Sequence, residues 1–153
     1  MRFSRIIVSL VSVLLFAVPL LAQRSGEPVS VTSSNNYGQT VQKFKDAVVG
    51  MQMMLISEAD HQMMLKMVQT ETKPSITILF GRPQMGAMLI KAEPKAALEM
   101  PMRVNIREMD DGKTYVYYYR PSYLFAHYRN RNLDQMGKDM DMMVQKLVDA
   151  ATK

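Results

Sequence analysis

The chain has 153 residues, a formal net charge of +5, sixteen methionines and no cysteine. The length suits one domain, and the missing cysteine excludes disulfides, thiol catalysis and thiolate metal sites. The positive charge is mild and interspersed with acids, so by itself it indicates little more than solubility.

The first segment has the layout of a secretory signal peptide. Arg2 and Arg5 precede an apolar run from Ile6 to Leu21, and cleavage is expected after Ala22. The run is shorter than the roughly 20 residues of a membrane-spanning helix, so we expect no stable membrane span after cleavage. We therefore expect residues 1–22 to be a signal peptide and the protein to be periplasmic or otherwise exported, which argues against a nucleic-acid partner.

The next segments predict two helices and a strand. Residues 23–36 are polar and rich in turn formers, as in a tether, and their later part can pair as an edge strand. "TVQKFKDAVVGM" has apolar residues at helical spacing, and Thr40 can cap that helix. "MMLISEAD" predicts a strand, after which Asp60 can cap a second helix over His61–Gln69 that ends before Pro74.

The second half predicts more strands and a long helix. "SITILFG" is an apolar, β-branched strand that Gly81 closes. A short helix follows over Gly86–Ala92, and "MRVNIREM" and "KTYVYYY" flank the turn signal Asp111-Gly112, as in a hairpin. Pro121 ends the second hairpin strand, and Leu133–Ala151 is a long amphipathic helix. Helices interleaved with hairpin strands predict an α+β fold, with an antiparallel-rich sheet and helices on one face.

The middle of the chain resembles a known family. "FGRPQMGAMLIKAEPKAALEMPMRV" is similar to the signature of the domain of unknown function 302 family, through Phe80, Gly81, Pro83, Gly86, Ala92, Pro94 and Pro101. "EADH" and "DGKTYVYYYRPSYL" also resemble family segments, and the predicted domain covers residues 37–153. The resemblance implies a TATA-binding-protein-like α+β architecture that is often dimeric. It implies no established activity, so it brings no catalytic residues.

The methionines divide into two groups. Fifteen of the sixteen follow residue 22, and methionine replaces leucine in cores at modest cost. On the C-terminal helix, one arc holds Met136, Met140 and Met143, which we assign to the core. On the helix that begins with "HQMMLKM", the helical wheel places four residues on the face expected to be buried, which are His61, Met64, Leu65 and Val68.

The remaining sulfurs have no evident place in the core. Met63 and Met67 lie opposite the expected buried face of their helix, and Met142 lies opposite the apolar arc of its own helix. With His61, these thioethers are candidate ligands of Cu(I), which favours soft donors. Exposed methionines can also absorb oxidants, form a dimer face or line an apolar ligand groove, or have no function.

A tyrosine-rich stretch gives a second set of candidates. In strand alternation Tyr115, Tyr117 and Tyr119 face one way. With Tyr123 and Arg120 they form a candidate ligand or interface patch, for which we favour a dimer contact over a ligand-binding wall. His127 receives no role.

No motif indicates an enzyme. The sequence has no Gly-rich phosphate loop, nucleophile elbow or two-histidine zinc helix. We predict an exported, homodimeric binding or accessory domain without a cofactor, whose methionine-rich surface serves dimerisation or binds a small apolar ligand. The alternative is a periplasmic Cu(I)-binding or copper-handling protein.

Overall fold

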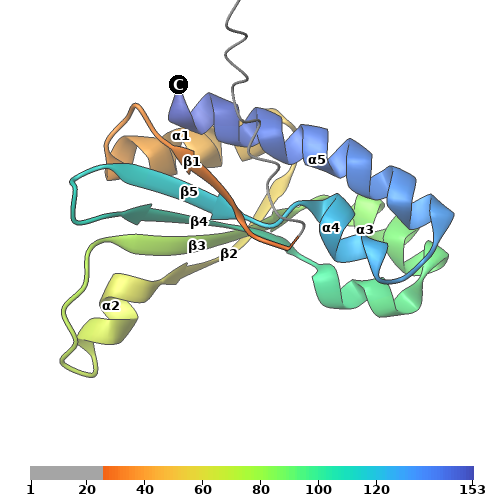
Figure 1. Cartoon of the computed structure of the whole chain (residues 1–153), viewed down its shortest axis with the longest axis horizontal. Coiled ribbons are helices and arrows are strands. Elements are labelled where there is room, and N and C mark those ends of the chain that lie inside the picture. The colour runs from red at the N-terminus through yellow and green to blue at the C-terminus, as the bar shows by residue number, and fades with distance from the viewer. Residues whose placement is uncertain (1–25) are drawn as a thin grey trace, which may run out of the picture.

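The computed structural model describes residues 26–153, so the predicted signal segment lies outside the described residues. Five strands form an antiparallel sheet in the order β1-β5-β4-β3-β2 (Figure 1). The strands are β1 (Val29–Thr32), β2 (Met54–Asp60), β3 (Ser75–Gly81), β4 (Met102–Glu108) and β5 (Thr114–Tyr118). The helices are α1 (Tyr37–Gly50), α2 (His61–Lys66), α3 (Pro83–Ala92), the 3-10 helix η1 (Pro94–Glu99), α4 (Pro121–Ala126) and α5 (Arg131–Thr152). The predicted α+β class is confirmed.

Helices α1 and α5 cover one face of the sheet (Figure 1). The strands alternate, so that Ile78, Val104 and Val116 are buried beneath these helices. Phe44 of α1 meets Phe80 of β3 edge to face, with ring centroids 5.3 Å apart. This geometry adds an aromatic contact to the apolar burial that holds α1 on the sheet.

A second cluster lies at one end of the sheet. It gathers buried side chains from α3, η1, α4 and α5, namely Leu89, Ala96, Phe125, Leu133 and Met140. Met136 and Met143 are half-buried and pack against it. The prediction that Met136, Met140 and Met143 belong to the core is therefore confirmed.

The strand predictions hold, and several helix ends differ. All five strands lie in segments predicted to form strands, with β1 inside the polar segment 23–36 and paired with β5. Gly112 has φ +75° in the hairpin turn, as the Asp-Gly signal predicts. Helix α3 begins three residues before the prediction, because Pro83 suits a first helical turn. The prediction contained no helix at η1 and none beginning at Pro121, where α4 starts.

Of the two predicted helix caps, one is confirmed and the other is wrong. Asp60 caps α2 as predicted, because its carboxylate accepts the Met63 backbone N–H at 2.9 Å. Thr40 does not cap α1. The cap is Asn36, which forms a reciprocal capping box with Gln39, and the buried Thr40 hydroxyl instead donates to the Asn36 carbonyl at 2.8 Å.

Helix α2 contradicts the sequence prediction. We expected His61, Met64, Leu65 and Val68 to form a buried face, but no residue of α2 is buried, and Val68 is 68% exposed. The reason is positional: α2 projects from the ends of β2 and β3, on the side of the sheet opposite α1 and α5 (Figure 1). No helix within residues 26–153 is long and apolar enough to cross a membrane.

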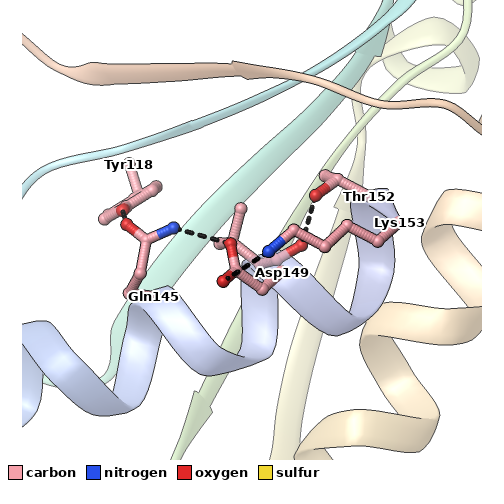
Figure 2. Close-up of polar contacts among 6 residues, drawn as sticks. Tyr118, Gln145, Asp149, Thr152 and Lys153 are labelled. Atoms are coloured by element: carbon pink, nitrogen blue, oxygen red, sulfur yellow. Dashed lines mark hydrogen bonds and ion pairs between the residues drawn. The ribbon is translucent and has the colours of Figure 1, made fainter.

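A chain of polar contacts ties the end of α5 to the sheet (Figure 2). The Tyr118 hydroxyl of β5 donates to Gln145 Oε1 at 2.9 Å, and Gln145 Nε2 donates to Asp149. Asp149 also accepts from Lys153 at 3.0 Å. The hydrogen bonds from Lys153 and Gln145 lower the pKa of the Asp149 carboxyl. The contacts therefore fix the position of the last turns of α5 over β5.

Gly137 allows α5 to approach α4 closely. A Cβ at this position would lie 2.7 Å from Ser122 Cα and 3.2 Å from a Phe125 ring carbon. The Ser122 hydroxyl and backbone N–H both donate to Asp141 of α5, so the two helices are held together beside this contact. No other residue fits without moving the backbone of α4.

We expect Gly137→Ala to destabilise the protein by about 1–3 kcal/mol, the usual cost of overpacking. Urea unfolding followed by circular dichroism measures the change. Gly50→Ala is the matched control, because a Cβ there meets nothing within 4 Å. It should leave stability within about 0.5 kcal/mol of the original or raise it. Equal unfolding midpoints for the two variants would contradict the predicted clash.

Candidate functional site

A groove lies at the end of the sheet that carries α3. It has a volume of about 400 Å³, within the range of about 300–1,000 Å³ typical of small-molecule sites. We call it the Met groove. It is lined by Met54, Ile56, Gly81, Arg82, Pro83, Met85, Gly86, Leu89, Ala97, Met100, Pro101, Met102 and Met140.

Five methionines from different segments meet in the Met groove. They come from β2, α3, the link between η1 and β4, β4 itself, and α5. Met140 is buried in the second cluster, whereas Met54 is 55% exposed at the groove edge. Because thioether side chains are unbranched and flexible, these walls can adjust to the shape of an apolar guest.

Two glycines leave the space that the groove occupies. A Cβ on Gly86 would lie 3.4 Å from Met100 Cε and 3.5 Å from its sulfur. A Cβ on Gly81 would lie 3.6 Å from Ile56 Cδ1. These contacts involve the ends of side chains, so a larger residue at Gly86 would occupy the groove without forcing a shift of backbone. The segment Phe80–Val104, on which the family resemblance rests, therefore supplies most of the lining.

Arg82 is the one charged residue that the described part of the chain contributes to the lining. One of its terminal nitrogens, Nη2, donates to the Met51 carbonyl at 2.5 Å, at the C-terminal end of α1. Its Nε is buried and has no hydrogen-bond partner. Among residues 26–153, Arg82 forms no ion pair. The groove thus combines apolar walls with a cation that lacks a counterion.

The four predicted metal ligands are not brought together. Met63 and Met67 are 61% and 80% exposed on α2, and Met142 is 60% exposed on α5, so these three sulfurs stand outside the core as expected. However, α2 and α5 lie on opposite sides of the sheet (Figure 1). His61 is occupied otherwise, because its Nε2 lies 2.8 Å from the Thr77 hydroxyl. Within residues 26–153, no three histidine or acidic side chains gather as a metal site.

Helices α1 and α5 leave one face of the sheet uncovered, which we call the open face (Figure 1). Tyr115 and Tyr117 lie on it, because they alternate along β5 with Val116, which is buried under the helices. Tyr115 and Tyr117 stack on β5 with centroids 6.1 Å apart. Tyr119 and Tyr123 stack at 6.4 Å, next to Arg120. The prediction that these tyrosines form one surface patch is compatible with this arrangement.

The open face also has arginines and a small hollow that the sequence reasoning did not single out. Arg103 and Arg107 are exposed on β4, and within residues 26–153 neither forms an ion pair. A hollow of about 260 Å³ lies between Arg103, Asn105 and Tyr117. The Asn105 amide is held rigidly, because it donates to the Ser75 hydroxyl, the Ile76 carbonyl and the Thr77 hydroxyl.

Tyr118 lies on the other face of β5 and is not part of this patch. Its side chain turns toward α5, where it bonds Gln145. Burial raises the pKa of the Tyr118 hydroxyl, which nearby Arg120 partly opposes. The hydroxyl therefore stays protonated and continues to donate to Gln145, so Tyr118 has a structural role.

The sequence contained a partial signal for the Met groove. Met85, Met100 and Met102 stand within the segment on which the family resemblance rests. Met54 and Met140 come from distant parts of the chain, and no local pattern links them to that segment. Arg82 lies between Gly81 and Pro83, which carry the resemblance, and was itself not singled out.

Comparisons with known proteins agree with the fold. A model of the family described as "Domain of unknown function DUF302" matches residues 29–151. The crystal structure of an uncharacterized conserved DUF302 protein from Bacillus stearothermophilus superimposes with a TM-score of 0.76, covering 82% of this chain and 98% of that one. The two sequences are 12% identical, so this likeness concerns the fold alone.

Curated relatives are longer proteins. Fluoride-specific ion channel FluC 1 of Brucella suis biovar 1 (strain 1330) is 23% identical over 120 residues, which cover 78% of this chain and 45% of that protein. FluC 1 of Brucella abortus biovar 1 (strain 9-941) is also 23% identical, with 42% of its length covered. This chain therefore spans less than half the length of the curated relatives it matches.

Proposed function

The chain belongs to the DUF302 family, and we propose that it is a non-enzymatic, exported binding module whose Met groove takes a small apolar ligand. One observation supports this function above others: five methionines and the family-like glycines and prolines line a single groove. Small-molecule sites are concave and mostly apolar, with few polar groups that orient the ligand. The Met groove has this composition.

An accessory role is supported by the longer relatives. Similar segments make up less than half of proteins named fluoride-specific ion channels, so a domain of this kind can be one part of a larger chain. Export is supported by the charged and apolar pattern of residues 1–22. The proposed module would bind its ligand in the periplasm or another exported compartment.

Filling the groove should weaken the binding of an apolar ligand. We expect Gly86→Leu to weaken the binding of decanol at least about ten-fold, which corresponds to about 1.4 kcal/mol, because the new side chain would occupy the space beside Met100. Displacement of a neutral fluorescent dye measures the affinity.

Ala87→Leu is the matched control for this variant. It adds a leucine to the same helix at an exposed position outside the groove lining, so the affinity for decanol should not change. Equal affinities of both variants and the unmodified protein would place the apolar site elsewhere and remove the basis of the proposal.

A second candidate function is Cu(I) binding within the same groove. The observation that favours it is the convergence of five thioethers from five segments, since such soft donors suit Cu(I). The originally predicted set of His61, Met63, Met67 and Met142 is less favourable, because α2 and α5 are separated by the sheet (Figure 1).

Leucine substitutions separate copper from an apolar ligand. Met85→Leu/Met100→Leu keeps the groove apolar and of similar volume, at a cost below about 1.5 kcal/mol per site, but removes two thioethers. If copper is the ligand, anaerobic titration against a Cu(I) chelator should show binding that this double variant loses. Met63→Leu/Met67→Leu is the control and should retain it. An unmodified protein that cannot compete with the chelator at micromolar concentration would exclude the copper function.

The homodimer remains a prediction, and the open face is a poor contact for it. Two copies meeting there would bring Arg103 and Arg107 of each protomer together, and like charges across an interface are unfavourable. Helix α2 and the residues after it are more suitable, because they expose Met64, Met67 and Val68. Covering this apolar surface would remove it from water.

We expect light scattering to give a dimer at micromolar concentration, and Val68→Glu to dissociate it by placing a charge in the contact. Tyr117→Glu, on the open face, is the comparison and should leave the dimer intact. If only Tyr117→Glu dissociates the dimer, the contact lies at the tyrosine patch of the open face. If the unmodified protein is a monomer, the dimer prediction is wrong.

A further inference from the structure

The charge distribution of the Met groove restricts which apolar ligand can enter it. Among the described residues that line the groove, Arg82 is the one charged residue, and none of them carries a carboxylate. The first 25 residues, which lie outside the described part, contain no aspartate or glutamate. No acidic group of residues 26–153 pairs with Arg82 either, so these residues supply no counterion for its guanidinium.

A structural role accounts for only part of the Arg82 side chain. Its Nη2 stabilises the C-terminal end of α1 by donating to the Met51 carbonyl, which suits a cation at that end of a helix. A guanidinium has five N–H donors, and the buried Nε has no acceptor. An unsatisfied buried donor is unfavourable, so the site is better satisfied when a further acceptor is present.

The backbone at the start of α3, next to Arg82, also carries a partial positive charge. Arg82 is the N-cap residue of α3, no side chain caps this helix end, and its first turn contains no acidic residue. The partial positive charge of a helix N-terminus therefore adds to that of Arg82. Both features favour a negative group at this end of the groove and disfavour a positive one.

We propose that the ligand of the Met groove is a single-chain amphipathic carboxylate, with its apolar chain against the methionines and its carboxylate at Arg82. This inference rests on the proposed function and adds the class of ligand. Arginine pairs with a carboxylate through geometrically matched hydrogen bonds, and the flexible thioethers accept an aliphatic chain of variable shape.

The test compares decanoate with decanol, which share a chain and differ in the head group. Calorimetric titration at neutral pH and low salt gives the affinity ratio of the acid to the alcohol. Arg82→Gln should lower this ratio about ten-fold, the effect of losing one charged hydrogen bond, while its affinity for decanol is unchanged. Glutamine retains an amide that can donate to the Met51 carbonyl, and thermal unfolding verifies that the variant remains folded.

Arg103→Gln is the control for net charge, because it removes an exposed arginine of β4 outside the groove lining. Its acid-to-alcohol ratio should equal that of the unmodified protein. An equal loss in both arginine variants would show a nonspecific charge effect and overturn the inference, as would a ratio that Arg82→Gln leaves unchanged. Tighter binding of decylamine than of decanoate, or binding of phospholipid vesicles without free decanoate, would also overturn it.

The outcomes separate this inference from the function on which it rests. If decanol and decanoate bind equally well to the unmodified protein and to Arg82→Gln, while Gly86→Leu blocks both, the apolar-ligand function stands and the carboxylate inference fails. If neither compound binds the unmodified protein, both fail.

Discussion

The packing of the whole domain depends on one long helix, α5, which contributes to both hydrophobic clusters. Helix α5 has 22 residues, a length of about 33 Å at 1.5 Å per residue. Its second half, with Val144, Leu147 and Val148, packs on the sheet beside α1, and its first half, with Leu133 and Met140, packs against α3 and α4. Because both clusters are anchored to the same rigid element, α3 is held at a fixed position relative to the ends of β2 and β4.

The Met groove is a consequence of this arrangement. The second cluster buries Leu89 of α3 and Met140 of α5 but leaves the flank between α3 and β2 unfilled, since Gly81 and Gly86 provide no side chains there. Methionine suits a wall that is core on one side and surface on the other, because it tolerates several shapes at small cost. The segment Phe80–Val104 therefore stabilises the fold through its buried residues and lines the Met groove through the others.

The surfaces outside the helical layer have different characters. The open face combines stacked tyrosines with Arg103 and Arg107, and it is polar and basic. Helix α2 instead exposes Met63, Met64 and Leu65, and His61 ties its start to the open face through the contact with Thr77. These differences make the Met groove, the open face and α2 suited to different partners, and they allow variants in one to serve as controls for another.

Local patterns were sufficient for the strands and for most of the helices. The alternation in "SITILFG" and the Asp-Gly turn between β4 and β5 depend on neighbouring residues, so the sequence determined them without tertiary information. Helix α2 has only six residues but was predicted because Asp60 marks its start, whereas η1 and the start of α4 were not recognised. The helical wheel also gave the relative directions of side chains on α2, but it could not say whether any neighbouring element would cover them.

By itself, then, the sequence determined the α+β class, the order of the strands along the chain, the family and the excess of sulfur over what the core requires. Only the tertiary structure decided that Met54 and Met140 meet Met85 in one groove, that Arg82 has no counterion among residues 26–153, and that no residue of α2 is buried. The physical reason is that periodicity fixes the direction of a side chain relative to its own helix or strand. Which atoms it finally meets depends on how distant elements pack together.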